Sequence, residues 1–275
     1  MSSTKVGFIG GGNMARSLIG GLIANGACGS NISVSDPEVD LREKLTNDFG
    51  VHAHAGNISA AEGANVIVFA VKPQILQKVV TPLANLIAEA QPLLISVAAG
   101  VTASSIERWV GGHTALIRVM PNTPALIGAG ISALYANHNV SDDQRALAEN
   151  IVAAVGKAIW INDEKLMNAV TAVSGSGPAY FFYMMQAIID AAVREGLDAE
   201  TARLLSLETA LGAARLAIES TENPGILQKQ VTSPGGTTEA AIQVLNDYGV
   251  QNTLQKAVSA ARARGNELAK FLDRD

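Results

Sequence analysis

The first part of the chain alternates short apolar runs with longer amphipathic stretches. The runs "KVGFIG", "NISVSD", "ANVIVFAV" and "PLLISVAAG" are rich in Val and Ile, as is typical of strands buried on both faces of a parallel sheet. The stretches between them carry the helical spacing of apolar residues, which predicts a doubly wound α/β fold. Ser141 and Gln144 form a capping-box pattern and predict a further helix. Three more strands are predicted at residues 114–120, 130–136 and 156–161.

The pattern changes after Asp163. Apolar positions now repeat with the helical period of 3.6, and no strand pattern follows. We therefore predict an α/β domain over residues 1–162 and an all-helical second domain over residues 163–275. The stretches with the helical period are residues 164–173, 178–195, 199–220 and 250–272.

The most apolar of these helices covers residues 179–193. It carries Gln186 and Asp190 and is shorter than the ~20 residues that span a bilayer, so we predict a helix packed in a core or against another subunit. Its aromatic and methionine residues are also compatible with a cofactor pocket. The helices of the second domain are apolar on more than one face, from which we expect a homo-oligomer.

A glycine-rich turn, "GFIGGGNMA", follows the first predicted strand and opens a helix. Gly10, Gly12 and Ala15 have the spacing that gives a tight turn, a close approach of the backbone to a pyrophosphate and close packing of helix on strand. The N-terminus of the helix then faces the phosphates. Residues 1–162 are therefore predicted to be a Rossmann-like domain that binds a dinucleotide, NADPH or NADH.

Asp36 ends the second predicted strand, where a carboxylate binds the adenosine ribose hydroxyls and repels a 2′-phosphate. That position favours NADH, but the neighbouring Ser35 can donate to a phosphate, and Asp36 before Pro37 also suits a turn or helix cap. The preference between the two cofactors stays open. The stretch "AVKP", residues 70–73, lies at the end of a predicted strand. Its Lys72 is a candidate phosphate or ribose contact, while Pro73 starts a helix.

Composition narrows the range of partners. The formal charge is −5 and no run of basic residues occurs, so neither nucleic acid nor a membrane surface is expected as a partner. The single cysteine, Cys28, excludes an intrachain disulfide and a Cys-based zinc cluster, and we predict no metal site. The first residues show no export signal, so we expect a cytoplasmic protein that acts on a small molecule.

A polar, glycine-rich turn, "VTSPGGTTEAA", separates two helical patterns at residues 231–241. Thr237 or Thr238 is predicted to cap the helix that follows, and the free backbone N–H groups of that helix attract an anion. The alternative is an ordinary capped turn between two helices.

The motifs "GFIGGGNMA", "AVKP" and "NTP", followed by "SGSGPAYFF" and "SPGGTTEAAIQVL", make the chain resemble pyrroline-5-carboxylate reductase along nearly its whole length. The resemblance implies reduction of the cyclic imine 1-pyrroline-5-carboxylate by NAD(P)H to L-proline, the last step of proline biosynthesis. It also implies that the helical domain binds the substrate and assembles into dimers or a pentamer of dimers. It places the cofactor contacts on Phe8, Ile9, Gly10, Gly11, Gly12, Asn13, Met14, Ser35, Asp36, Asn57, Ala70, Val71, Lys72 and Pro73.

The implied substrate carries a carboxylate and a ring C=N. The backbone N–H groups at Thr237 and Thr238 are expected to bind the carboxylate, and the Thr238 hydroxyl is the catalytic candidate that hydrogen-bonds the imine nitrogen. Only small residues let the backbone approach a ligand so closely, which explains the glycines. The predicted substrate-binding residues are Ser233, Gly235, Gly236, Thr237, Thr238 and Ser176.

Two of the polar residues near these motifs allow a structural role as well. Ser176 lines the substrate pocket or caps a helix, and Asn122 contacts the nicotinamide side or fixes a turn. We predict no catalytic histidine, because all of the histidines lie away from the two specific motifs, and the protonated iminium can take its proton from water. The histidines, all in loop or edge patterns with solvated roles expected, are His52, His54, His113 and His138.

Two other functions are compatible with parts of the sequence pattern. A β-hydroxyacid dehydrogenase has a similar two-domain plan but needs a catalytic lysine from the first long interdomain helix, a place that neither Lys165 nor Lys157 clearly fills. A non-catalytic NAD(P)-binding sensor is a different class, and the intact substrate loop argues against it.

Overall fold

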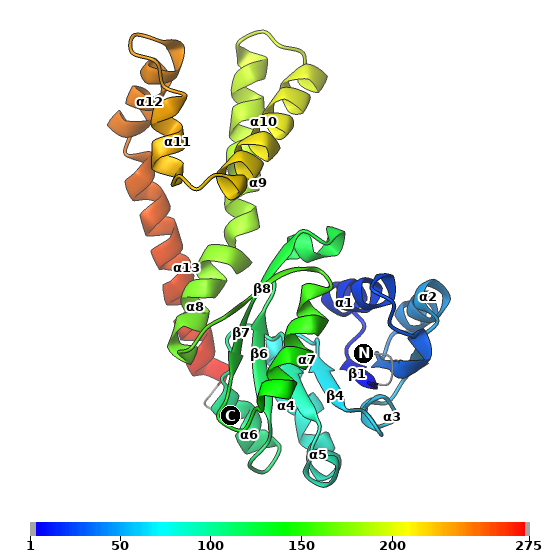
Figure 1. Ribbon diagram of the computed structural model, residues 1–275. Coiled ribbons are helices and arrows are strands. Elements are labelled where there is room, and N and C mark those ends of the chain that lie inside the picture. The colour runs from blue at the N-terminus through cyan, green and yellow to red at the C-terminus, as the bar shows by residue number, and fades with distance from the viewer. Residues whose placement is uncertain (1–3, 273–275) are drawn as a thin grey trace. The chain divides into compact units, whose positions relative to one another are not determined.

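The computed structural model describes residues 4–272 and divides the chain into two compact units (Figure 1). The first unit comprises Met1–Ser176 together with Ala261–Asp275, and the second comprises Gly177–Ala260. The boundary expected from the sequence lies earlier, at residues 162/163. Packing explains the difference, because Asn168 hydrogen-bonds Asn266 at 2.7 Å and Leu272 packs against the core of the first unit.

The first unit is built on an eight-stranded sheet with the order β3-β2-β1-β4-β5-β6-β7-β8. Among the described strands of this sheet, only the β6–β7 pair is antiparallel. The predicted fold class and seven predicted strands are confirmed, and the structure adds the three-residue edge strand β3, which is too short to show a pattern. The strands are β1 (Val6–Ile9), β2 (Ile32–Ser35), β3 (His52–His54), β4 (Val66–Phe69), β5 (Leu93–Ser96), β6 (Leu116–Met120), β7 (Gly130–Ala136) and β8 (Gly156–Trp160).

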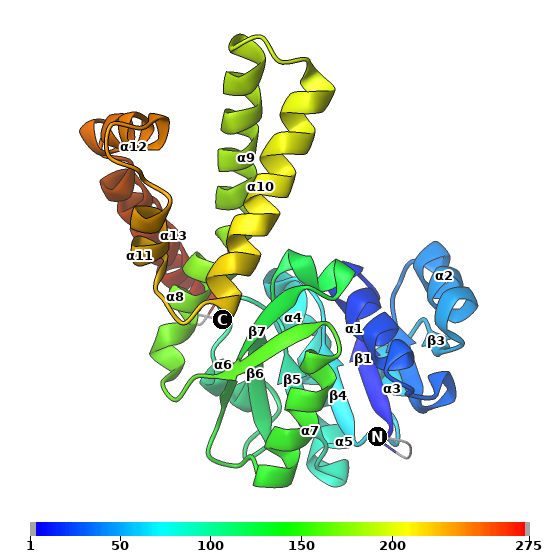
Figure 2. The same cartoon turned by 45° about the horizontal axis from the view of Figure 1, so that its top comes forward.

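Helices cover both faces of this sheet (Figures 1 and 2). Two buried hydrophobic clusters result, one that includes residues of α1 and α7 and another that includes residues of α3 to α6. The capping box at Ser141 and Gln144 is confirmed, with both of its hydrogen bonds present. The helices are α1 (Asn13–Ala24), α2 (Val39–Phe49), α3 (Asn57–Ala61), α4 (Pro73–Val80), α5 (Ala84–Ala90), α6 (Ala103–Trp109), α7 (Asp142–Ala153) and α8 (Met167–Val170).

Short helical turns connect these elements. Four are 3₁₀ turns and the last is a π-helical turn at the end of the first unit. Such π-helical turns are rare and often lie at functional sites. The turns are η1 (Gly29–Asn31), η2 (Thr81–Leu83), η3 (Thr123–Ile127), η4 (Glu164–Leu166) and η5 (Thr171–Gly175).

The second unit is entirely helical, as the periodicity predicts. Within residues 4–272 no strand follows β8. The longest helix that lies wholly within this unit, α10, has Asp198 as its N-cap. The Asp198 carboxylate accepts the Thr201 N–H at 2.9 Å, and hydrogen bonds from Thr201 lower the pKa of Asp198. The helices are α9 (Gly177–Arg194), α10 (Ala199–Glu219), α11 (Pro224–Gln230), α12 (Thr237–Asp247) and the start of α13 (Val250–Leu272).

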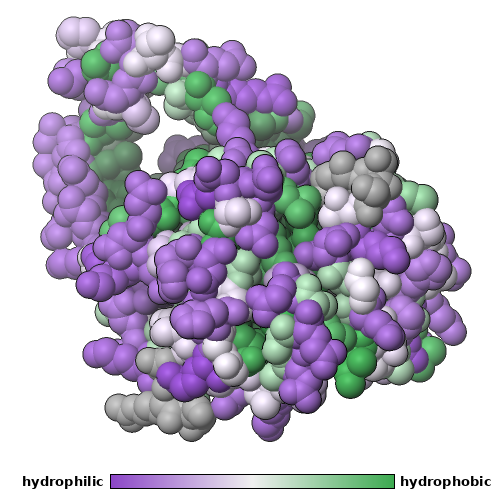
Figure 3. Space-filling view, turned by 60° about the horizontal axis from the view of Figure 1, so that its bottom comes forward, coloured by the Kyte–Doolittle hydropathy of each residue, from purple (hydrophilic) through white to green (hydrophobic). Residues whose placement is uncertain are grey.

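The second unit exposes much of its apolar surface. Phe181, Phe182 and Ile218 are each more than 60% exposed, and an apolar cavity of about 710 Å³ lies between α9, α12 and α13. The helix predicted to be packed, residues 179–193, is therefore mostly uncovered in the single chain, which leaves subunit packing as its explanation. Hydrophilic residues predominate on the face seen in Figure 3. In the part of the chain that the structure describes, no helix is both long and apolar enough to cross a bilayer.

Candidate active site

The glycine-rich loop lies at the carboxyl ends of β1, β2 and β4. Gly10 donates its N–H to the Ser35 carbonyl at 2.8 Å, and Ala70 donates to the Ile9 carbonyl at 2.8 Å. Gly10 has a φ of +98°, and a Cβ there would collide with the Ala70 carbonyl oxygen, so only glycine fits. The chain reverses its direction across the sheet between β1 and β4, the place where open α/β sheets bind ligands.

Gly12 is the residue that leaves room for a ligand. It precedes α1 as the N-cap and has no side-chain cap, and a Cβ built on it meets no atom within 4 Å. The first N–H groups of α1, at Asn13 and Met14, have no protein acceptor among the described residues. Free donors beside open space fit the pyrophosphate of a dinucleotide.

Asp36 has a structural task in this loop. Its Oδ2 accepts the Gly11 N–H at 2.8 Å and its Oδ1 accepts the Glu38 N–H at 2.9 Å, and the residue is only 9% exposed. The turn role considered for Asp36 is therefore confirmed, and its contact with a ribose stays a prediction. Each oxygen keeps a second lone pair for a ribose hydroxyl.

Ser35 is buried, and its hydroxyl is bound within the protein. The Ser35 Oγ donates to the Asn57 Oδ1 at 2.8 Å, which links β2 to the start of α3. Ser35 and Asn57, both predicted cofactor contacts, are therefore directly bonded to each other. It also argues against Ser35 as the group that receives a phosphate.

Arg42 was not foreseen from the sequence. Its Nη1 donates to the carbonyl oxygens of Asp36 at 2.7 Å and Pro37 at 2.9 Å, so the half-buried guanidinium lies over the β2–α2 loop. A guanidinium has five N–H donors, and the two carbonyls engage one nitrogen. The only sign of this contact in the sequence is that Arg42 follows Asp36 by six positions and lies on the next helix, α2.

The remaining predicted cofactor residues line the same edge. Phe8 and Ile9 are fully buried in the core, so only their backbone reaches the loop. Lys72 is exposed directly after β4 and precedes Pro73, which starts α4 as predicted. Val71 lies beside Gly10, where its side chain would meet a Cβ on that glycine.

A buried ion pair lies on the α6 face of the sheet, another feature that sequence patterns did not reveal. The Arg118 Nη1 lies 2.6 Å from the Glu164 Oε1, which also accepts the Ala103 N–H at 2.7 Å. Burial, and then the nearby Glu164, raise the pKa of Tyr135 on the neighbouring strand. Lys165 lines a 240 Å³ cavity beside Arg118 and Asn168.

The turn that precedes α9 comes close to the end of β6. A Cβ on Gly175 would meet the terminal methyl group of Met120, so a larger residue here would have to displace that flexible side chain. Ser176 donates its N–H to the Thr171 carbonyl at 2.8 Å, as part of the π-helical turn. Asn122 fixes a turn, because its Oδ1 accepts the Ile131 N–H at 3.0 Å.

The predicted substrate loop, residues 233–238, belongs to the second unit and joins α11 to α12. Gly235 has a φ of +71° and the Gly236 N–H bonds the Ser233 carbonyl at 3.0 Å, the geometry of a type II turn. The predicted cap at Thr237 or Thr238 is wrong. Gly236 is the N-cap and contributes no side chain, because both threonines already have helical positions.

The N-terminus of α12, next to the predicted substrate loop, therefore has backbone N–H groups that no side chain caps. The N–H groups of Thr237 and Thr238 have no protein acceptor among the described residues. The Thr238 side chain is partly buried. This helix end can receive an anionic group in the same way as the start of α1.

The histidines do not belong to the loops described above. His52 and His54 lie on the edge strand β3, and the His113 and His138 rings contact edge to face at 6.4 Å. No cluster of three or more His, Cys, Asp or Glu side chains that could hold a metal occurs within residues 4–272.

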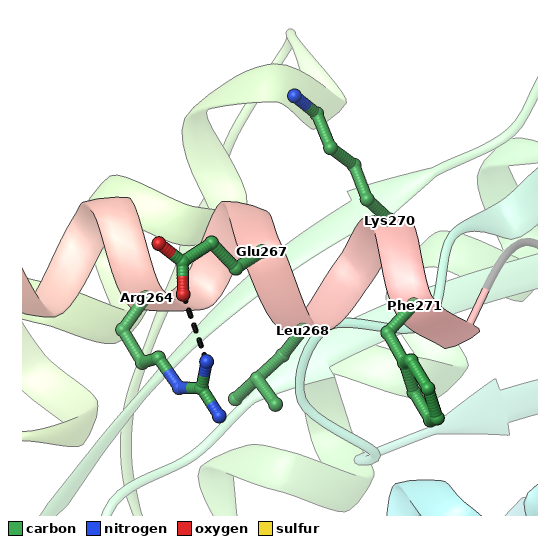
Figure 4. A pocket seen from close by; sticks show the side chains of 5 residues that line it. All are labelled: Arg264, Glu267, Leu268, Lys270 and Phe271. Atoms are coloured by element: carbon green, nitrogen blue, oxygen red, sulfur yellow. Dashed lines mark hydrogen bonds and ion pairs between the residues drawn. The ribbon is translucent and has the colours of Figure 1, made fainter.

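A cavity of about 490 Å³ lies along the end of α13 (Figure 4). There Leu268 and Phe271 point to one side, Lys270 points away, and Arg264 pairs with Glu267 at 2.8 Å. None of these residues belongs to the predicted site.

Two family models match the chain. Residues 5–100 match NADP oxidoreductase, coenzyme F420-dependent, and residues 164–268 match pyrroline-5-carboxylate reductase dimerisation. The pyrroline-5-carboxylate reductase of Pseudomonas aeruginosa is 47% identical over 99% of both chains.

Solved structures of the same family are similar over the whole chain. The pyrroline-5-carboxylate reductase of Coxiella burnetii has a TM-score of 0.92 and 44% identity, covering 97% of this chain and 99% of that one. The Plasmodium falciparum enzyme, solved with NADP bound, has a TM-score of 0.88 and 30% identity, covering 98% and 99%. The cofactor loop, the helical second unit and this full-length similarity together show that the chain belongs to the pyrroline-5-carboxylate reductase family.

Proposed function

We propose that this chain reduces 1-pyrroline-5-carboxylate to L-proline with NADPH or NADH, the last step of proline biosynthesis. The observation that carries the proposal is the 47% identity to a pyrroline-5-carboxylate reductase along 99% of the chain. The test is to follow NAD(P)H absorbance with the imine supplied and to identify the product. Oxidation of the cofactor with formation of proline is expected, and its absence with a folded protein would exclude the activity.

The division of labour follows the two domains expected from the sequence. Residues 1–162 bind the dinucleotide, with the pyrophosphate at Gly12 and the start of α1. Residues 163–275 bind the substrate and form the subunit contacts. The cofactor, when bound, supplies the hydride that adds to ring carbon 5.

The substrate loop orients the ring for that addition. The N–H groups of Thr237 and Thr238 bind the substrate carboxylate, and the helix dipole of α12 adds about 0.3–1 kcal/mol. The Thr238 hydroxyl hydrogen-bonds the ring nitrogen, which gains the electron pair of the C=N bond and keeps the proton taken from water. Positioning of the ring is then the main contribution of the protein. We also propose that Ser176 binds the substrate.

Thr238→Ala tests this arrangement. We expect kcat/KM for the imine to fall about tenfold, the value of one hydrogen bond of about 1.4 kcal/mol, with cofactor affinity unchanged. Steady-state kinetics and cofactor titration measure the two quantities separately. An unchanged kcat/KM would remove Thr238 from the mechanism.

Arg42 supports the use of NADPH despite Asp36. The Arg42 guanidinium lies at the carboxyl end of β2, and only its Nη1 donates to the two carbonyls, so its other N–H groups are available. An arginine in this region accommodates a 2′-phosphate. The Asp36 carboxylate is partly neutralised by the Gly11 and Glu38 N–H groups. We therefore propose that both cofactors bind.

Arg42→Gln should weaken NADPH about tenfold and leave NADH unchanged, because only NADPH carries the 2′-phosphate. Titration with 2′,5′-ADP and 5′-AMP measures the same difference without turnover. Lys44→Gln, which removes an exposed positive charge from the same helix, is the matched control. An equal loss of NADPH affinity in the two variants would mean that Arg42 acts only through its positive charge and does not contact the 2′-phosphate.

The exposed apolar helices support assembly through the second unit. We propose a dimer formed by α9 and its neighbours, and a pentamer of such dimers as the complete particle. Light scattering after size-exclusion chromatography distinguishes the dimer, the decamer and a monomer. We further propose a cytoplasmic location, with which the exposed free thiol of Cys28 is compatible.

A further inference from the structure

The Glu239 side chain makes a contact that the mechanism above does not use. Its Oε2 accepts the Gly235 N–H at 2.7 Å, across the substrate loop. Glu239 is the third residue of α12, at the helix end that is proposed to hold the substrate carboxylate. We propose that Glu239 is a positioning residue that holds the substrate loop in its binding conformation, an inference that rests on the proposed function of the loop.

The contact selects one form of the turn. Type I and type II turns differ by a flip of their central peptide, which here joins Pro234 to Gly235 and carries the Gly235 N–H. The φ of +71° at Gly235 identifies the type II form. Since the Glu239 carboxylate accepts that N–H, a flip of the peptide would break the bond. The side chain therefore holds the turn in the type II form.

The same contact does not occupy the first N–H groups of α12. A Glu at this helix position commonly accepts the N–H of the N-cap, but the Gly236 N–H is already bound to the Ser233 carbonyl. The carboxylate reaches one residue further back, to Gly235. The N–H groups of Thr237 and Thr238 thus stay available for the carboxylate of the substrate.

Charge and hydrogen bonding have opposite effects at this position. The Glu239 carboxylate carries the same charge as the substrate, so its negative charge does not favour binding. What it contributes is an acceptor for the Gly235 N–H. Gln keeps a carbonyl acceptor of the same length without the charge, and Ala removes the acceptor.

The experiment compares Glu239→Ala, Glu239→Gln and Thr238→Ala in the full-length enzyme. Glu239→Ala should raise KM for the imine about fivefold to tenfold, with smaller changes in kcat and no change in KM for NADPH, because one charge-assisted hydrogen bond is lost. Glu239→Gln should restore KM to the wild-type value or below. Glu208→Ala, an exposed glutamate of α10, is the control and should leave all constants unchanged.

Amide hydrogen exchange at Gly235 gives a second readout. Exchange should become faster in Glu239→Ala and stay slow in Glu239→Gln. Unchanged KM and exchange in Glu239→Ala, or a Gln variant as impaired as Ala, would overturn the inference. If Thr238→Ala is impaired and Glu239→Ala is not, only the role of Glu239 fails; if neither matters, the loop itself is not the substrate site.

Discussion

Gly12→Thr is expected to lower NADPH affinity about 100-fold while leaving the free energy of unfolding of the cofactor-free protein within about 0.5 kcal/mol of wild type. The fold tolerates the change because Gly12 has a φ of −67° and a Cβ there meets no atom. Thr and Gly are also comparable as N-caps. The affinity falls because the side chain fills the space before α1 and its hydroxyl competes for the N–H groups that would bind phosphate.

Gly10→Ala is the informative contrast. Its φ of +98° and the Ala70 carbonyl oxygen leave no place for a Cβ, so this variant should lose stability together with cofactor affinity. Isothermal titration with NADPH and urea unfolding of the cofactor-free protein measure the two effects. If Gly12→Thr binds NADPH normally, the start of α1 is not the pyrophosphate site.

The sequence carried enough information for the sheet and helices because their patterns are local. Runs such as residues 64–71 are apolar on both faces, and the structure buries Val66 and Phe69 completely within the sheet. The glycine fingerprint is likewise local, since its spacing alone identifies Gly10, where a Cβ would meet the Ala70 carbonyl oxygen, and Gly12, where the protein leaves space. The packing units could not be located in this way, because the helical period is the same on both sides of residue 176 or 261.

Contacts between distant side chains left no such signal. Arg42 donates back to the Asp36 carbonyl, and Ser35 at the end of β2 binds Asn57 at the start of α3. A long flexible side chain has many possible partners, so its position in the sequence does not identify one. The predicted cap at Thr237 or Thr238 failed for a related reason. The type II turn that begins at Ser233 places the N-cap of α12 at Gly236, and the residue pattern does not show which of the residues before the helix is the cap.

The ion pair between Arg118 and Glu164 is expected to be the polar contact of the first unit whose loss lowers the free energy of unfolding most. Glu164→Ala should lower the free energy of unfolding by about 2–3 kcal/mol, because Arg118 is left without its counter-charge and the Ala103 N–H without its acceptor. Arg118 is 8% exposed but the Glu164 side chain is 25% exposed. Solvent at Glu164 therefore reduces the loss below the 3–5 kcal/mol typical of fully buried pairs.

Glu267→Ala is the matched control for this prediction. It breaks the Arg264–Glu267 pair in Figure 4, whose two side chains are 67% and 65% exposed, and should cost less than about 0.5 kcal/mol. Urea unfolding at neutral pH measures both variants against wild type. Equal losses in the two variants would mean that water in the cavity beside Arg118 solvates the unpaired guanidinium. A large loss in Glu164→Ala alone would instead show that this pair anchors the segment leading into the second unit.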